Sequence, residues 1–487
     1  MSPINTSMTA LELEQLSKPE LIAIILRFER RLNELEAEVA VLRKRNAELE
    51  AEVARLRKNS SNSSKPPSSD IVKPPKPPAP RGQGKRRIGG QPGHPRHERV
   101  AFPPERIDTI RTYKLKRCPD CGSRLKQTKG EHRVIQQVEV VAKPVRIVEH
   151  RAGSYFCTHC GKAHDAPMPR SVAKCGLIGP NLTAIVAYLK GVCHASFSTI
   201  RKFLQDVMHV TVSRSQLAKL IGKVSAALAG PYQDLLKQLP HQDQLNVDET
   251  GHKDNGKTLW TWCFRAKLFT LFKIDPSRGS DVLIEVLGKE FDGVLGCDYF
   301  SAYRKYMEDF GVAVQFCLAH LIREVKFLLT LPDRVMRNYA QRLLDSLRKL
   351  FRVIHRRHKM TPQQFQKAME RARKKVLKIG RRAPMRREAQ NLAQRFRKHG
   401  AAYFQFITTP GMEPTNNLAE QAIRFVVIDR RITQGTRGIA GRQWNERIWT
   451  TVATLTQQGR PILTYLRDAF GAYLHNQPAL SLLTAGP

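Results

Sequence analysis

Apolar residues recur at alternating spacings of three and four between residues 25 and 56, and this repeat constrains the fold more than any other feature of the sequence. It predicts one continuous helix whose apolar stripe needs a second helix to cover it. The repeat places Ile25, Leu32, Val39, Asn46 and Val53 at its a positions, and Phe28, Leu35, Leu42, Leu49 and Leu56 at its d positions. Such a pattern favours two parallel helices, with the lone Asn46 fixing their register. We therefore predict a parallel coiled coil, and hence a homodimer or higher assembly, over residues 1–58.

Residues 59–105 are rich in Ser and Pro and then in Gly, Lys and Arg. A segment of this composition buries too little apolar surface to offset the entropy of ordering it. We predict a disordered basic linker. A helix that packs on its own domain is the alternative to the coiled coil, but this linker gives the helix no neighbouring core.

The chain of 487 residues carries 82 Lys and Arg against 43 Asp and Glu, a net charge of +39. This excess indicates a polyanionic partner, and nucleic acid is the leading candidate because basic side chains release its condensed counterions. A membrane surface is the weaker candidate, since the N-terminus is polar and we find no run of 18 apolar residues. We expect a cytoplasmic protein of three or four domains.

Two Cys-x-x-Cys pairs, Cys118 with Cys121 and Cys157 with Cys160, predict a zinc-ribbon-like module over residues 106–170. Strands are predicted between the pairs, over Val134–Val141 and Val145–Val148. The pairs are about 35 residues apart, farther than in most zinc ribbons, so a redox dithiol or reduced thiols remain alternatives. The other cysteines are predicted to be buried small apolar residues: Cys175, Cys193, Cys263, Cys297 and Cys317.

Residues 171–240 have a helical pattern throughout, with one helix over Pro180–Gly191 and a third helix that Ser213 caps. The third helix exposes Arg214, Gln216 and Lys219, which is compatible with a helix-turn-helix that binds DNA. Three short helices without DNA contacts are the alternative.

Residues 241–440 alternate between strands and helices. Strands are predicted over Leu245–Asp248, Thr258–Phe264, Leu268–Ile274, Val294–Asp298 and Val312–Phe316, and helices over Ser280–Leu287 and Leu318–Leu329. Three successive strands before the first helix fit a ribonuclease-H-like sheet better than a dinucleotide-binding fold. No Gly-rich loop follows the first strand, so nucleotide hydrolysis has no support. A C-terminal helical tail is predicted over residues 441–487.

A very basic helical insertion is predicted over about 330–400. Its charge density demands a counter-anion, for which the DNA backbone is the leading candidate. Four arginines are predicted to contact the DNA: Arg381, Arg382, Arg386 and Arg387.

Three carboxylates are the candidate catalytic residues. Asp248 and Asp298 each end a predicted strand, and Glu420 lies in a helix far downstream. Carboxylate oxygens are the ligands that Mg²⁺ prefers, and two such ions can act on both oxygens of a phosphoryl transfer. The alternatives are turn or cap roles for the aspartates and, for Glu420, a capping box and an ion pair with Arg424. Arg424 on the same helix face could instead approach a phosphodiester.

Several motifs in the same order resemble the transposases of the insertion sequence 66 family over nearly the whole chain. They are the predicted coiled coil followed by Asn62–Asp70, the two cysteine pairs, Val247–Thr250, Asp298–Tyr303, Cys317–Arg323 and Asn416–Arg424. The resemblance implies an Asp-Asp-Glu triad of Asp248, Asp298 and Glu420 that binds Mg²⁺ or Mn²⁺, beside the zinc of the cysteine module. It also implies cleavage at the ends of an insertion sequence and joining of the 3′-hydroxyl ends to target DNA.

The resemblance implies, as partners, terminal inverted repeats, target DNA and companion proteins of the same element. A non-catalytic dimeric DNA-binding repressor derived from such an element is the alternative function. A structure-specific nuclease that cuts without joining is a third.

Overall fold

The computed structural model describes residues 15–59, 62, 101–110, 120, 136–138, 144–157 and 162–483. The chain divides into two compact units. One contains Met1–Pro74, Pro167–Lys202 and Thr211–Pro487, and the other contains Pro75–Ala166 and Phe203–Val210.

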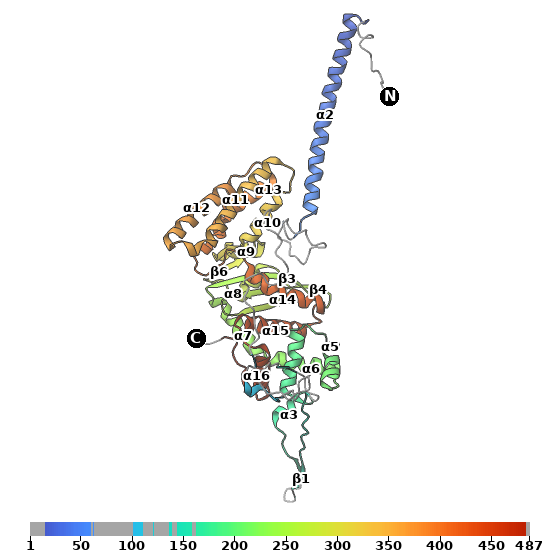
Figure 1. The fold of residues 1–487 in the computed structure, drawn as a ribbon, viewed down its shortest axis with the longest axis vertical. Helices are drawn as coiled ribbons and strands as arrows, with labels where there is room; N and C mark the ends of the chain where they lie inside the picture. Colours follow the sequence, from blue (N-terminus) through green and yellow to red (C-terminus); the bar gives the residue numbers. More distant parts are fainter. Residues whose placement is uncertain are drawn as a thin grey trace. The chain divides into compact units, whose positions relative to one another are not determined.

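The N-terminal repeat forms a single long helix, α2, over Lys18–Leu56 (Figure 1). Ser17 and Glu20 begin it with a capping box, in which the backbone N–H of Ser17 donates to the Glu20 carboxylate at 2.8 Å. The apolar a and d residues are exposed in the single chain, Leu32 at 58% and Leu42 at 67%. The predicted helix is therefore confirmed, while its pairing into a coiled coil stays a prediction.

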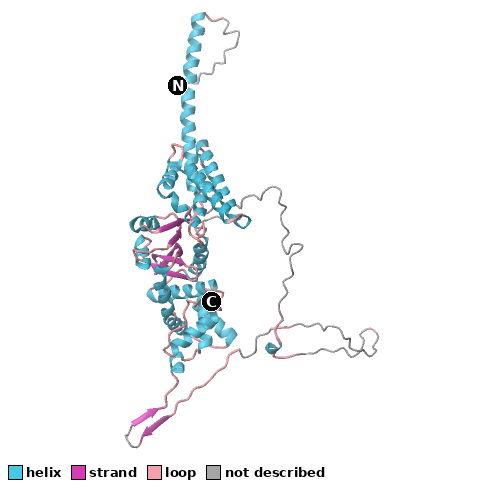
Figure 2. Ribbon diagram, turned by 90° about the vertical axis from the view of Figure 1, so that its left-hand side faces the viewer, coloured by secondary structure: helices cyan, strands magenta, loops and turns pink. Residues whose placement is uncertain are grey.

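The described part of the second unit contains a short 3-10 helix, η2 (Pro104–Arg106), and an antiparallel hairpin of β1 (Ser154–Cys157) and β2 (Lys162–Asp165) (Figure 2). The predicted strand over Val145–Val148 is wrong, because these residues form no ladder. Pro144 offers no N–H just before them, and Ile147 is 89% exposed, with no described surface to cover. Most of the predicted strand Val134–Val141 lies outside the described residues, as do Cys118, Cys121 and Cys160.

Five helices precede the sheet: α3 (Arg170–Cys175), α4 (Pro180–Gly191), α5 (Phe197–Met208), α6 (Arg214–Ala227) and α7 (Ala229–Gln238), followed by the 3-10 helix η3 (Leu239–His241). The predicted bounds of α4 and the Ser213 cap of α6 are confirmed. The α4 and α6 helices pack on the last two helices of the chain, α15 (Ile439–Gln457) and α16 (Ile462–Leu474). Gly191 allows this approach, since a Cβ there would lie 2.3 Å from Ile448 Cγ1.

One apolar stretch, Ser171–Gly191, is long and apolar enough to cross a membrane by length and composition alone. It contains two helices, α3 and α4, which are separated at Gly176, where φ is +68°. Val186 and Ala187 in α4 are fully buried within the protein. The α4 part of the stretch therefore contributes to a protein core.

The central sheet has five strands: β3 (Gln244–Asp254), β4 (Lys257–Arg265), β5 (Thr270–Asp275), β6 (Val294–Cys297) and β7 (Ala313–Phe316). Their order is β5-β4-β3-β6-β7, with antiparallel pairing among β5, β4 and β3 and parallel pairing among β3, β6 and β7. All five predicted strands are present. The intervening helices are α8 (Ser280–Leu287), α9 (Ser301–Phe310) and α10 (Leu318–Leu328), and helices lie on both sides of the sheet (Figure 2).

The predicted basic region is helical, with α11 (Arg334–His355), α12 (Pro362–Arg381) and α13 (Arg387–His399) packed beside one another (Figure 1). Three 3-10 helices belong to the same region: η4 (Arg357–Lys359), η5 (Gly400–Tyr403) and η6 (Gln405–Ile407). The chain then returns to the sheet through α14 (Asn417–Thr433).

The edge strand β5 is covered by side chains of α15 rather than by another strand. Its backbone N–H groups at Thr270, Phe272 and Ile274 donate to Thr454 Oγ1 at 3.1 Å, Thr450 Oγ1 at 3.0 Å and Glu446 Oε1 at 2.7 Å. The donors recur every two residues along the strand and the acceptors every four along the helix, so both periods bring the groups into register. The predicted C-terminal tail thus completes the sheet of the core.

We predict that Thr450→Val, which keeps the side-chain shape and removes the acceptor, lowers the free energy of unfolding by about 1–3 kcal/mol, because the buried Phe272 N–H loses its partner. Urea denaturation measures the difference. Thr450→Ser keeps the hydroxyl and is the control for the lost acceptor. Equal stability of Thr450→Val and wild type would show that the bond is dispensable.

Candidate active site

Asp248 lies in strand β3, and Asp298 lies at the end of the neighbouring strand β6. The parallel strands β3 and β6 pair in register at Asn246 and Gly296, and each aspartate follows its paired residue by two positions. Because side chains alternate along a strand with a period of two, both carboxylates lie one step beyond the same rung of the ladder. The sequence predicted that each aspartate lies at the end of a strand. This is confirmed for Asp298, which directly follows β6.

The sequence predicted that Asp248 ends its strand, and this prediction is wrong. After Asn246 the β6 partner ends, but β3 continues to pair with β4 as far as Asp254, and Asp248 itself lies opposite Cys263. The apolar run ends at Asp248 because β6, one of the two neighbours of β3, ends near this position. The strand β3 itself extends to Asp254.

Glu420 reaches this part of the sheet because the start of α14 is fixed to β3 by two buried asparagines. Asn416 donates from Nδ2 to the Val247 carbonyl at 2.8 Å and accepts at Oδ1 from Asn246 Nδ2 at 3.0 Å. Asn416 is 1% exposed. Its partner Asn246 lies against Gly296, where a Cβ would come within 2.5 Å of Asn246 Nδ2. The glycine before Asp298 therefore makes room for the contact that holds the glutamate helix.

Cys317 joins the same network from the end of β7. Its backbone N–H donates to the Cys297 carbonyl at 2.8 Å, and its Sγ accepts from the backbone N–H of Asn416 at 3.2 Å. The predicted burial of Cys263, Cys297 and Cys317 is confirmed. The prediction is wrong for two cysteines near the ends of helices, since Cys193 is exposed and Cys175 is half-buried.

The aspartates lie among like charges and are half-buried. Burial, followed by the charges of Glu249, Asp298 and Glu420, raises the pKa of Asp248 well above its usual value. Burial and the nearby Glu249 carboxylate raise the pKa of Asp298 to about 7. Asp248 therefore lies within electrostatic range of both Asp298 and Glu420.

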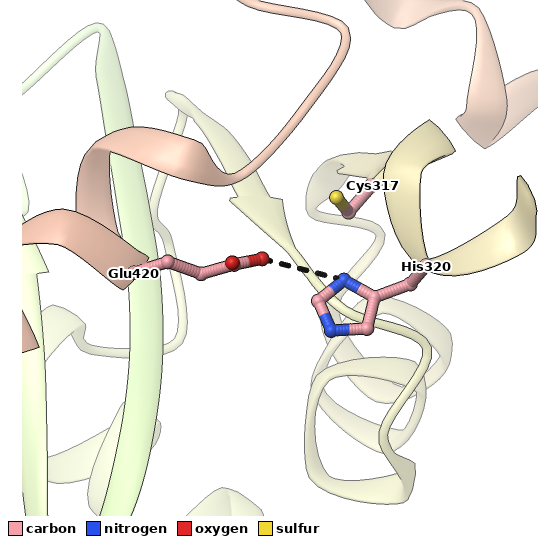
Figure 3. A group of neighbouring side chains, drawn as sticks. All are labelled: Cys317, His320 and Glu420. Atoms are coloured by element: carbon pink, nitrogen blue, oxygen red, sulfur yellow. Dashed lines mark ion pairs between the residues drawn. The ribbon is translucent and has the colours of Figure 1, made fainter. Parts of the chain in front are cut away.

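Glu420 is held by residues of α10 (Figure 3). Its Oε1 lies 3.6 Å from His320 Nδ1, and its Oε2 lies 3.6 Å from Arg323 Nη2. His320 Nδ1 and Glu420 Oε1 are buried and form no hydrogen bond with the residues that the structure describes. The ligating atoms of Cys317, His320 and Glu420 all lie within 4.8 Å of one another.

Two predicted structural roles of Glu420 are wrong. The N-cap of α14 is Asn416, whose side chain caps nothing because it bridges to β3, so no capping box forms. The ion pairs of Glu420 cross to α10, while Arg424, the expected partner one turn along, is exposed on the helix surface.

Glu249 is a further buried carboxylate that the sequence analysis did not single out. It directly follows Asp248 in β3, so its side chain points to the opposite face of the sheet. There it accepts from Arg278 Nη2 at 2.6 Å and from the Tyr303 hydroxyl, and its side chain is only 2% exposed. The available signal was its place in a strand buried on both faces, which demands a cationic partner.

The predicted DNA-contacting residues have different surroundings. Arg214 and Lys219 are exposed on α6, whereas Gln216 forms the capping box with Ser213 and so already has a structural role. In the basic helical region, Arg386 Nε donates to Asp333 Oδ2 at 2.6 Å, and Arg381 Nε donates to the Phe396 carbonyl at 3.4 Å.

The other two arginines of this region that were predicted to contact DNA are Arg382 and Arg387. Arg387 is exposed at the start of α13, and Arg382 lines a groove between α11 and α12. The four arginines therefore have different surroundings, and their contact with DNA stays a prediction.

Comparison with known families identifies the chain as a transposase, a DNA-binding enzyme. It belongs to the IS66 family: the family model described as Transposase IS66 family matches residues 175–443, more than half of the chain. The zinc-finger binding domain of transposase IS66 matches residues 115–161, so the protein carries a zinc-finger domain. A family of unknown function matches residues 25–100. A search of curated proteins gives no match.

We predict that Asn416→Ala lowers the free energy of unfolding by about 2–4 kcal/mol, because Asn246 Nδ2 and the Val247 carbonyl lose their partner inside the protein. Denaturation in urea gives the value. Asn417→Ala, at the exposed neighbouring position, is the matched control and should change stability by less than about 0.5 kcal/mol. Similar values for the two variants would contradict the proposed anchor.

We also predict that Asp298→Asn raises the melting temperature of the metal-free protein by about 2 °C or more at pH 8 and by less at pH 5.5. The folded-state pKa of about 7 lies above the usual value of 3.8, so this carboxyl costs the fold increasing stability as pH rises from the usual pKa through 7, and the neutral amide removes that cost. Asp292→Asn, on an exposed side chain, is the control. A variant that melts at a lower temperature than wild type at pH 8 would show that the ionised Asp298 carboxylate does not destabilise the fold.

Proposed function

We propose that the protein cuts DNA at the ends of an insertion sequence and joins the 3′-hydroxyl ends to target DNA, with Asp248, Asp298 and Glu420 as the catalytic triad. The observation that carries the proposal is the convergence of three carboxylates from β3, β6 and α14 despite their mutual repulsion. Two of them, Asp248 and Asp298, have raised pKa values, which are typical of functional sites. The sheet order β5-β4-β3-β6-β7 supports a ribonuclease-H-like core.

The carboxylates fit a divalent metal centre of Mg²⁺ or Mn²⁺. The donor set consists of carboxylate oxygens, which hard cations prefer, and Glu420 Oε1 is buried without a hydrogen bond to any residue that the structure describes. Burial and neighbouring carboxylates raise the pKa values of Asp248 and Asp298, so a cation bound there would neutralise charge that the site otherwise disfavours. When bound, such ions would lower the pKa of an attacking water and stabilise the leaving oxygen.

The chain's own residues hold this site in place. The Asn416 bridge sets the start of the glutamate helix beside β3, and Arg278 neutralises Glu249 on the opposite face. His320 and Arg323 restrain the Glu420 carboxylate. Burial lowers the pKa of His320 to about 4, so the imidazole is neutral at pH 7 and adds no positive charge that would compete with a metal ion.

The other parts of the chain supply binding and assembly in this proposal. The exposed a and d residues of α2 pair two protomers as a parallel coiled coil, one for each transposon end. Cys118, Cys121, Cys157 and Cys160 hold the zinc ion. Arg214 and Lys219 contact the terminal repeats from a helix-turn-helix, and Arg424 lies near the scissile phosphate. We also propose a cytoplasmic, nucleoid-associated protein, the domain boundaries given by the sequence, and companion proteins of the element.

We predict that Asp248→Asn, Asp298→Asn and Glu420→Gln each reduce strand cleavage by at least about a thousandfold while DNA affinity changes less than about threefold. The triad acts on one phosphodiester, whereas affinity comes from many basic contacts. The assay uses DNA carrying the element ends, with Mg²⁺, and scores cleavage and strand transfer separately. Asp292→Asn is the matched control for loss of an acidic side chain.

The same assay separates the proposed function from its alternatives. A wild-type protein that binds end DNA and never cuts it would be a repressor. Cleavage without joining would identify a nuclease. Wild-type cleavage by Glu420→Gln would remove Glu420 from the triad.

A further inference from the structure

We propose that the groove between α11 and α12 is a binding site for the sugar-phosphate backbone of duplex DNA. The groove is about 650 Å³ in volume where it is lined by Arg342, Asp345, Ser346, Lys349, Lys374, Lys375, Lys378, Ile379 and Arg382. A second, smaller hollow continues it from Lys349 along α11 and is lined by Arg352, Val353, Arg356 and Met360. The proposal rests on the proposed function only in that the bound DNA is the substrate of the same chain.

The groove is far more basic than its own acids can neutralise. Eight of its thirteen lining residues are Lys or Arg, and one, Asp345, is acidic. Asp345 already accepts from Gln341 at 2.9 Å and from Arg348 at 3.2 Å, neither of which lines the groove. Glu370 lies 3.9 Å from Lys374 but 3.0 Å from Arg373. The remaining cations need an external anion.

Helical periodicity places these cations in one stripe. On α11 the lining positions Arg342, Lys349 and Arg356 are separated by two turns each, and on α12 Lys374, Lys378 and Arg382 by one turn each. From Arg342 to Arg356 the stripe is about 21 Å long, or about six base-pair rises of duplex DNA. It therefore has the length of a DNA contact rather than of a small anion.

The groove is rigid before any ligand binds. Leu343, Leu347 and Leu350 of α11 are buried. The Tyr339 hydroxyl donates across to the Gly380 carbonyl of α12 at 2.9 Å. Gly380 also lies against the Phe396 ring, where a Cβ would come within 2.5 Å. The two helices that carry the cations therefore need little ordering when a ligand binds.

The lining chemistry favours a duplex backbone over bases. The lining contains no aromatic side chain for stacking and no Asn or Gln for bidentate contact to adenine. Its one hydroxyl, Ser346, donates to the Leu343 carbonyl within its own helix. What remains is a row of phosphate-binding cations, which gives affinity without sequence preference.

The test compares two variants that each lose four positive charges. The groove variant replaces Lys349, Lys375, Lys378 and Arg382 with Gln, and the control variant replaces Lys237, Lys257, Lys267 and Lys289 with Gln. All eight side chains are exposed, so both proteins should fold, which circular dichroism and melting check. A milder groove variant, Lys375→Gln with Lys378→Gln, provides the result if the fourfold change perturbs folding.

We expect the groove variant to bind duplex DNA at least about tenfold more weakly at ~0.15 M salt and to reduce the slope of log affinity against log salt by about two to three. The control variant should stay within about twofold of wild type. Equal losses in both variants, or none in either, would overturn the proposal. So would a loss confined to double-stranded RNA, or displacement of DNA from wild type by micromolar inorganic phosphate.

The result is independent of the triad. Wild-type cleavage by Asp248→Asn together with weak binding by the groove variant would reject the proposed catalytic site and retain the groove. Loss of cleavage by Asp248→Asn with normal binding by the groove variant would do the reverse.

Discussion

The bridge from Asn416 to Val247 and Asn246 is the contact on which the candidate site depends most. It joins residues about 170 positions apart, across the whole basic helical region, and sets Glu420 beside the strand that carries Asp248. It sets the position of the start of the glutamate helix along β3. Cys317 extends the bridge to the ends of β6 and β7, so one buried polar network positions all three carboxylate-bearing segments.

The site stores electrostatic repulsion that the rest of the fold must withstand. Asp248 lies near both Asp298 and Glu420, and partial burial reduces the water that would screen the charges. The fold responds on two sides, with Arg278 against Glu249 and with His320 and Arg323 against Glu420. These contacts keep the carboxylates in place without fully neutralising them, and that residual charge is what would attract divalent cations.

Local patterns in the sequence predicted most of the helices and strands of the core. Alternation predicted the five strands, Ser213 predicted the start of α6, and the heptad predicted α2, because each signal is contained within a few residues. Long-range contacts were not predictable in this way. Nothing near Asn416 indicates that its side chain turns away from its own helix, and nothing near Glu249 indicates Arg278. The strand predicted at Val145–Val148 failed for the same reason, since a strand needs a partner that its own sequence does not contain.

In the basic helical region, too, local features were predictable from the sequence and long-range contacts were not. Counting charges correctly predicted a basic helical region, but the arginines at positions 381 and 386 are engaged by neighbouring groups. The cations without such partners come from two helices whose packing brings one face of each together. Only the packed pair defines a groove, and it lies on the same chain as the candidate active site.

The position of bound metal tests the central claim most directly. Crystals of the protein with DNA carrying an element end, grown with Mn²⁺, would give anomalous difference peaks at the metal positions. The account predicts peaks between Asp248 and Asp298, one of them shared with Glu420, and their loss in Asp298→Asn. No peak at the aspartates, or a peak held only by Cys317 and His320, would contradict it.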